Sequence, residues 1–311
     1  MKDRSAVYGR ISHHLTTGWV SKLITAIFIV LSMIVIGLVV VSNWETIESF
    51  EWQIRPVWFI FIVIFFVIDL LVATWAWHLL VVRLANYRNF RQSAKICWWA
   101  NLARRIPTPV WYIAGRAIMY EKVGVSKTTT SLLSTLELLL FLLSGLATTL
   151  LTLPFWAIPP ELSQNVNPWL LLILLLPLSL LFIHPRLLEK SWRWLRPEIP
   201  LTPLRWQDTI TLLFYYILAW IFGALVLFSL LNLLYPVPIT NLIPVIGIWS
   251  LAGSISLAGA LTISVVGVRE ISLILLLTIL VPAPIALIVA ILIRVIWLLG
   301  ELLSAVVSFK L

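Results

Sequence analysis

The sequence predicts an all-α protein, a polytopic membrane bundle of about seven or eight segments, one or two of them broken or re-entrant. Composition is the first observation: 61% of the 311 residues are hydrophobic and 11% are charged, whereas soluble domains carry about 25% charged residues. A series of apolar runs long enough to cross a bilayer is the second. The third is that basic residues gather between these runs. We therefore expect a single transmembrane domain over residues 1–311.

The apolar runs define the expected segments, and a usable span has about 17–25 residues. In chain order the runs are Leu23–Val41, Val57–Val82, Thr130–Leu153, Trp169–Ile183, Ile210–Tyr235, Ile243–Ile263, Ile271–Val281 and Ile285–Val307. The fourth and the seventh are shorter than this range. The first is too long for the apolar part of a signal peptide and no small-residue cleavage site follows it, so we expect a transmembrane helix there.

The short run Ile271–Val281 allows two interpretations. It either belongs to a longer crossing helix that begins near Ser264, or it enters the membrane and returns on the same side. The second option requires protein or a water-filled cavity around the broken backbone. The two options place the C-terminus on opposite sides of the membrane.

Basic residues set the expected orientation. They concentrate in the N-terminal segment 1–22, in residues 83–128 and in the loop 185–208, whereas the alternate connections contain the acidic residues Glu45, Glu48, Glu51 and Glu161. Short cytoplasmic loops are enriched in Lys and Arg. We therefore expect a multi-pass protein of a prokaryotic cytoplasmic membrane with a cytoplasmic N-terminus. These loops also account for the net charge of +9, so nucleic acid is not an expected partner.

Two stretches have the composition of interrupted membrane elements. In Cys97–Met119, tryptophans alternate with arginines, and Pro107 and Pro109 interrupt helical hydrogen bonding. Gly247–Glu270 carries four glycines. Interrupted apolar segments in the two halves of a chain are typical of transporter sites. The alternatives are an amphipathic helix on the inner leaflet for the first stretch and plain helix packing for the glycines of the second.

Arg269 and Glu270 are the only charged residues of the long stretch 209–293. A charge at membrane depth costs at least ~2.5–3.5 kcal/mol on insertion scales, so it needs a partner or a use. We expect this pair to meet Arg294 and Glu137 in the bundle interior. There the arginines would either hold a lipid phosphate or pair with the two glutamates. Purely structural ion pairing is one alternative, and a loop position for Arg269 and Glu270 is another.

Several of these residues fall in runs that resemble a known family. The runs are Pro109-Val110-Trp111-Tyr112-Ile113-Ala114-Gly115-Arg116, Glu121-Lys122-Val123-Gly124-Val125-Ser126, Leu136-Glu137, Gly267-Val268-Arg269-Glu270, and Arg294 followed by Trp297-Leu298-Leu299-Gly300-Glu301. In order and spacing they resemble the lysylphosphatidylglycerol synthase transmembrane region, also called the flippase-like membrane family. The resemblance extends from about Leu23 to Val307. The chain departs from the family at Ile263-Ser264-Val265-Val266, where many members have a Pro-Gly-Gly turn.

The resemblance implies a flippase-like protein that binds or translocates an anionic phospholipid or a lipid-linked substrate such as a lipid-linked glycan. The expected substrate-binding residues are Arg116, Glu137, Arg269, Glu270, Arg294 and Glu301. Candidate headgroup contacts are Arg104, Arg105, Trp111 and Tyr112, and for Arg104 and Arg105 a role in membrane topology alone is an equal alternative. The aminoacyltransferase activity of bifunctional family members is not expected, because the resemblance covers only their membrane part.

Enzyme chemistry is not expected, since no nucleophile–base pattern or nucleotide-binding loop is present. One cysteine and four histidines without ligand spacing predict no metal site and no cofactor. A non-catalytic membrane scaffold for enzymes that modify envelope lipids or glycans is the alternative function, and a membrane-embedded transferase is the least expected. Besides membrane lipids, the expected partners are a second copy of the chain or a partner membrane enzyme.

Overall fold

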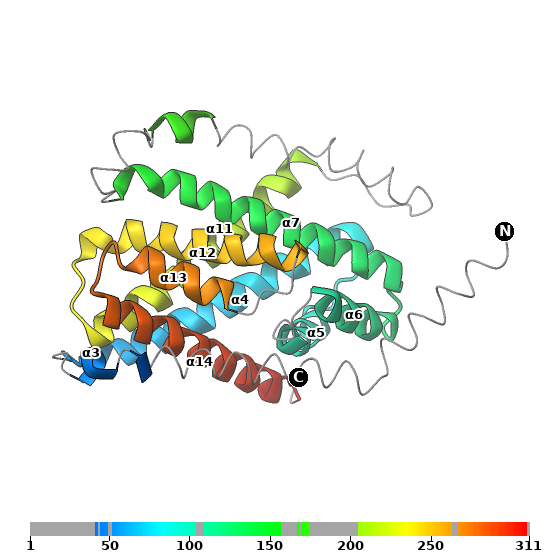
Figure 1. Ribbon diagram of the computed structural model, residues 1–311. Helices are drawn as coiled ribbons and strands as arrows, with labels where there is room; N and C mark the ends of the chain where they lie inside the picture. Colours follow the sequence, from blue (N-terminus) through cyan, green and yellow to red (C-terminus); the bar gives the residue numbers. More distant parts are fainter. Residues whose placement is uncertain are drawn as a thin grey trace. The chain divides into compact units, whose positions relative to one another are not determined.

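The computed structural model describes residues 41–42, 44–48, 52–103, 109–156, 167, 169–174, 205–262 and 267–309 (Figure 1). The chain divides into two compact units, Met1–Phe50 and Glu51–Leu311. In the first unit the described helix is α3, Trp44–Glu48. The predicted run Leu23–Val41 and most of Trp169–Ile183 lie outside the described residues, as do the basic segment 1–22 and nearly all of the loop 185–208.

The second unit is helical, and its described residues form no strand. Its elements are α4 (Val57–Ala85), α5 (Phe90–Ala103), α6 (Pro109–Glu121), α7 (Lys127–Thr152), η1 (Leu153–Phe155), α11 (Trp206–Leu234), η2 (Ile239–Asn241), α12 (Leu242–Thr262), α13 (Val268–Leu277) and α14 (Ala283–Ser308). The described part holds five helical segments long and apolar enough to cross a membrane: Val57–Ala85, Lys127–Phe155, Trp206–Leu234, Ile239–Gly259 and Ala283–Ser308. The all-α class is confirmed, and these segments indicate a membrane protein.

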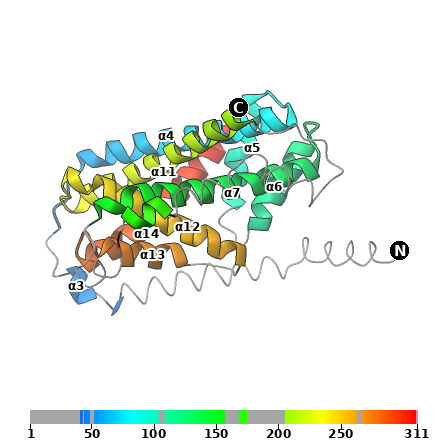
Figure 2. The same cartoon turned by 90° about the horizontal axis from the view of Figure 1, so that it is seen from above.

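Antiparallel pairing of α4 and α11 defines the two ends of this unit. At one end the Arg83 Nε lies 2.7 Å from an Asp208 carboxylate oxygen. At the other, the backbone N–H of Gln53 donates to the carbonyl of Leu234 at 3.2 Å. We call these the Asp208 end and the Leu234 end. Figures 1 and 2 show α11 lying lengthwise beside α4, and α7 and α12 running along the same long direction.

Small residues allow two of these helices to approach closely. Gly145 of α7 faces Ser254 of α12, and a side chain at Gly247 would collide with Thr152 near the end of α7. These contacts make α7 and α12 antiparallel. Gly253 likewise lies against the ring of Trp220. Gly247 and Gly253 therefore fit the helix-packing interpretation, because a Cβ at either position would collide with a side chain of a neighbouring element.

The described parts of Cys97–Met119, residues 97–103 and 109–119, belong to two packed helices, α5 and α6. His78 of α4 hydrogen-bonds Ser93 of α5 at 3.2 Å, and Thr74 accepts from Trp98 at 2.9 Å. The earlier residue of α5, Ser93, bonds the later residue of α4, and Trp98 bonds the earlier one. Helix α5 therefore runs antiparallel to α4, away from the Asp208 end. Helix α6 then leads back to α7, whose first residue is at the Asp208 end. Tyr120 of α6 is fully buried, which argues against the amphipathic-surface interpretation.

The first part of the predicted short run, residues 271–277, lies in α13, whose 10 residues extend about 15 Å, roughly half the ~30 Å hydrocarbon core. Helices α12 and α14 both start at the Leu234 end, so the chain between them must return to that end, and α13 carries its last part. Figure 1 shows α13 running beside α14 in the opposite direction. The start of the longer crossing helix predicted from Ser264 lies outside the described residues, and α13 by itself covers only about half the distance.

Candidate functional site

The first charged cluster joins α6 to α7 inside the bundle. Arg116 Nη1 donates to Glu137 Oε2 at 2.5 Å, and the Tyr112 hydroxyl donates to the same oxygen at 2.7 Å. The side-chain exposures are 0% for Arg116 and 6% for Glu137. Tyr112, Arg116 and Tyr120 recur every four residues, which places them on one face of α6. That face is turned toward α4 and α7.

Two aromatic rings and a thiol complete the surroundings of Arg116. Its guanidinium carbon lies 3.8 Å from the ring centroid of Trp77 and 4.2 Å from that of Tyr112. Its Nη2 donates to the Cys97 sulfur at 3.2 Å. Burial by itself lowers the pKa of Arg116, but the Glu137 carboxylate outweighs burial and the net shift is upward. The guanidinium therefore stays charged, with protein atoms on all its faces.

The sequence around this cluster explains how α6 is connected to α7. The N–H groups of Gly124 and Val125 donate to the carbonyls of Glu121 and Tyr120, at 3.1 and 3.0 Å. This is the Schellman ending, which needs a left-handed residue, and Gly124 has φ +89°. Ser126 then caps α7 by accepting the Thr129 N–H at 3.1 Å. The run 121–126 is thus a helix stop followed at once by a helix start, and it fixes the register between Arg116 and Glu137.

The second charged cluster joins α12, α13 and α14. Arg294 Nη1 donates to Glu270 Oε1 at 2.9 Å, with side-chain exposures of 33% and 20%. The Arg269 guanidinium lies over the ring of Trp249 at 4.1 Å. A cavity of about 30 Å³ lies among these side chains and Trp297. This cluster is partly open, whereas the first one is closed.

The depth of the second cluster follows from its partners. Arg294 lies near the middle of α14, and α13 begins beside it with Gly267 as its N-cap, at φ +96°. The N-terminus of an α-helix carries about half a positive charge and unpaired N–H groups. Here that terminus sits near mid-length of a helix long enough to cross a membrane, together with two arginines and one glutamate. Such a group can attract an anion, and in its absence the charges stabilise one another.

The structure thus distributes the predicted residues over two clusters instead of one. Glu137 lies with Arg116 and Tyr112, while Arg294 lies with Glu270 and Arg269. Glu301 is buried on α14 and Trp111 is half-buried on α6. Arg104 and Arg105 lie outside the described residues.

Sequence reasoning missed the aromatic partners of both arginine groups. The ring of Trp77 lies under the Arg116 guanidinium and that of Trp249 under the Arg269 guanidinium. In a sequence, tryptophans within apolar runs are interpreted as membrane-interface or packing residues. The spacing of Tyr112, Arg116 and Tyr120 was the available signal. Among the described residues, no three His, Cys, Asp or Glu side chains are placed to hold a metal ion.

No protein-family model and no curated protein matches this chain.

Proposed function

We propose that this protein binds an anionic phospholipid or lipid-linked substrate and moves its headgroup between membrane leaflets. The observation that carries the proposal is the start of α13 beside Arg294, near the middle of a candidate span. Half-length helices whose N-termini point into the membrane interior are a recurrent way to hold anionic groups in transporters. The resemblance to the lysylphosphatidylglycerol synthase transmembrane region favours the same proposal.

Exposure separates the roles of the two clusters in this mechanism. Arg294 is one-third exposed and its partner Glu270 one-fifth, so a phosphate oxygen can compete with the carboxylate for the guanidinium. Binding would exchange one charge-assisted hydrogen bond for another, which keeps the cost of charge at this depth low in both states. Arg116 and Glu137 would fix the fold of α6 against α7 around this path.

The proposed orientation places the Asp208 end in the cytoplasm of a prokaryotic cell. Arg83, Arg88 and Lys127 lie there, and cytoplasmic ends of spans are enriched in basic residues. On this assignment α5 and α6 enter from the cytoplasmic side, whereas α13 connects to the outer side through residues 278–282. The two interrupted elements would then approach the bilayer interior from opposite sides.

The test is leaflet exchange in vesicles that contain the purified full chain. Fluorescent phosphatidylglycerol, phosphatidylcholine and a polyprenyl phosphate are each reconstituted, and the fraction accessible to a membrane-impermeant quencher is followed in time. We expect exchange above that of empty vesicles for at least one anionic lipid. No exchange for any lipid refutes translocation and favours the scaffold alternative.

Variants connect that activity to the second cluster. Arg294→Gln should abolish exchange, while Arg294→Lys should retain part of it, because lysine keeps the charge and loses the planar fork. Lys127→Gln is the matched control, since it also removes one positive charge but from an exposed pair with Glu121. Equal activity in all three variants would contradict a role for Arg294, and gel-filtration profiles show whether each variant is folded.

A further inference from the structure

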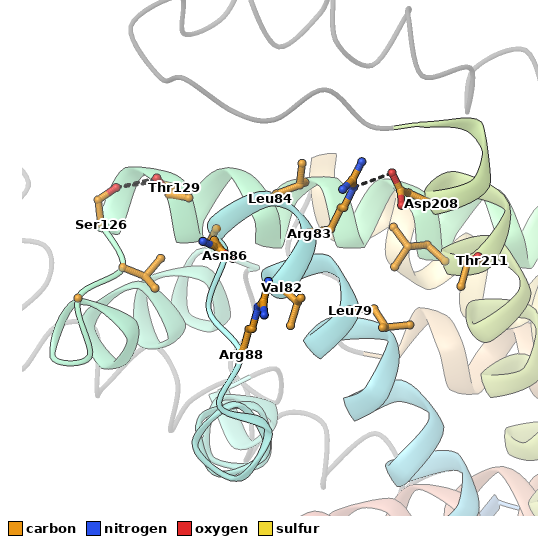
Figure 3. Close-up of a pocket in the computed structure, with 14 residues that line it drawn as sticks. Leu79, Val82, Arg83, Leu84, Asn86, Arg88, Ser126, Thr129, Asp208 and Thr211 are labelled. Carbon is orange, nitrogen blue, oxygen red and sulfur yellow. Dashed lines mark hydrogen bonds and ion pairs between the residues drawn. The ribbon is translucent and has the colours of Figure 1, made fainter.

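A cleft of about 730 Å³ opens at the Asp208 end of the bundle, away from both charged clusters. Its walls are the end of α4, the turn that leads into α7, and the start of α11 (Figure 3). The size falls within the ~300–1,000 Å³ range of ligand pockets.

The polar side of the cleft has the groups that an anion requires. Arg88 lines it from the loop after α4, and Arg83 lines it opposite with its partner Asp208. Figure 3 shows Ser126 and Thr129 on one side of Arg88 and the Arg83–Asp208 pair on the other. Because Asp208 offsets one of the two arginines, these side chains leave about one positive charge for a ligand.

The start of α7 adds a second source of positive potential. Ser126 is the N-cap of this 26-residue helix and Thr129 lies in its first turn, and the N-terminus of a helix favours negative charge. Their hydroxyls lie 2.8 Å apart, so one donates to the other and one hydroxyl remains as a donor for a ligand. An anion in the cleft would thus meet the helix terminus on one side and the arginines on the other.

The depth of the cleft selects the kind of anion. The candidate spans end at Ala85 and begin at Lys127 and Trp206, so the cleft lies at the level where lipid headgroups are found. Its other wall is apolar, formed by Leu79, Val82 and Leu212, which reach toward the bundle interior. A ligand with a phosphate at one end and acyl chains at the other matches both walls, whereas a free anion uses only the polar one.

We infer that this cleft is a binding site for the phosphate headgroup of an anionic phospholipid in the leaflet at the Asp208 end. The inference goes beyond the proposed function, because the lipid binds here whether or not it is moved to the other leaflet. It depends on the membrane placement of α4, α7 and α11, and not on any step at Arg294.

Native mass spectrometry of the full chain in detergent micelles tests the inference, with phosphatidylglycerol or phosphatidylcholine as the added lipid. Arg88→Gln removes one exposed arginine and should weaken phosphatidylglycerol binding about five-fold, since a basic residue near an anionic surface contributes ~1 kcal/mol. Lys127→Gln, at the same end but outside the cleft lining, is the matched control and should change binding less than two-fold. Phosphatidylcholine binding should be the same in all variants.

Location is tested separately with phosphatidylglycerol that carries a diazirine in its acyl chain. Labelling of peptides that contain Leu79 and Val82, reduced by Arg88→Gln, supports the inference. Equal weakening by Arg88→Gln and Lys127→Gln overturns it, because the effect is then one of surface charge. Displacement of the lipid by millimolar inorganic phosphate also overturns it, since the site would then select a free anion. Loss of leaflet exchange with retained binding refutes only the proposed function.

Discussion

Removing one partner of the Arg116–Glu137 pair should destabilise the fold strongly. The change is Glu137→Gln, which keeps the size of the side chain and an oxygen for the Tyr112 hydroxyl. It leaves the Arg116 guanidinium charged and fully buried, with no counter-charge at 2.5 Å. Breaking a buried ion pair in this way costs about 3–5 kcal/mol in free energy of unfolding.

The reverse change, Arg116→Met, should also destabilise the fold. It leaves the buried Glu137 carboxyl without the Arg116 counter-charge and also removes the contacts to Trp77 and Tyr112, each an arginine–ring interaction of about 0.5–2 kcal/mol. We therefore expect Arg116→Met, like Glu137→Gln, to be less stable than the wild type, because each variant leaves one member of a buried ion pair behind.

A double-mutant cycle measures the pair itself. Unfolding is followed by tryptophan fluorescence in mixed micelles with increasing denaturing detergent, for both single variants and the double variant. The coupling energy should be about 2–3 kcal/mol, the upper range for side chains in contact. The exposed pair Lys127–Glu121, at 55% and 53% exposure, is the matched control and should couple by less than about 1 kcal/mol. Equal coupling in the two cycles would refute the reasoning, because the interior pair would then be hydrated.

Three further predictions concern helix packing, backbone strain and the pKa of a buried tyrosine. Gly300→Ala should lower the free energy of unfolding by about 1–3 kcal/mol, because the new methyl would overlap the ring of Phe66. Gly115→Ala, with nothing within 4 Å of the new methyl, should raise it by up to about 1 kcal/mol. Unfolding in denaturing detergent measures both. Gly124→Ala should cost about 1–2 kcal/mol in the same assay, because its φ of +89° strains a residue with a Cβ. Burial raises the pKa of Tyr120 to about 12, so its contribution is complete below pH 10 and lost as pH rises toward 12. The tyrosinate absorbance difference between wild type and Tyr120→Phe should therefore appear only above about pH 11.

Most of the helical segments could be predicted from the sequence because length and apolarity follow directly from bilayer thickness. The predicted run Val57–Val82 became α4, and Ile285–Val307 became α14, within a few residues. Helix ends differ because caps and not hydropathy set them: Ser126 starts α7 ahead of the predicted Thr130. Similarly, α13 ends at Leu277, although the apolar run continues to Val281.

The grouping of charges could not be predicted in the same way. Hydropathy shows that Glu137 needs a partner, but not which helix lies beside it. Arg269 and Arg294 are the partners that the sequence predicts, because they lie, like Glu137, within long apolar stretches. The actual partner, Arg116, is only 21 residues away in sequence, and the short connection from α6 to α7 makes these two helices neighbours. Local connectivity therefore decided the pairing, and the Gly124–Ser126 turn was the sequence feature that encoded it.

Exposure then determines which of the two clusters can meet a ligand. The Arg116 guanidinium lies between two aromatic rings, and both of its Nη atoms donate hydrogen bonds to protein atoms. A phosphate therefore cannot reach it. Arg294 is held by one partner and remains one-third exposed. Since a buried charge needs full compensation and a functional one needs a replaceable partner, the first cluster fits a structural role. The α13 terminus is the position at which a headgroup could exchange with a carboxylate.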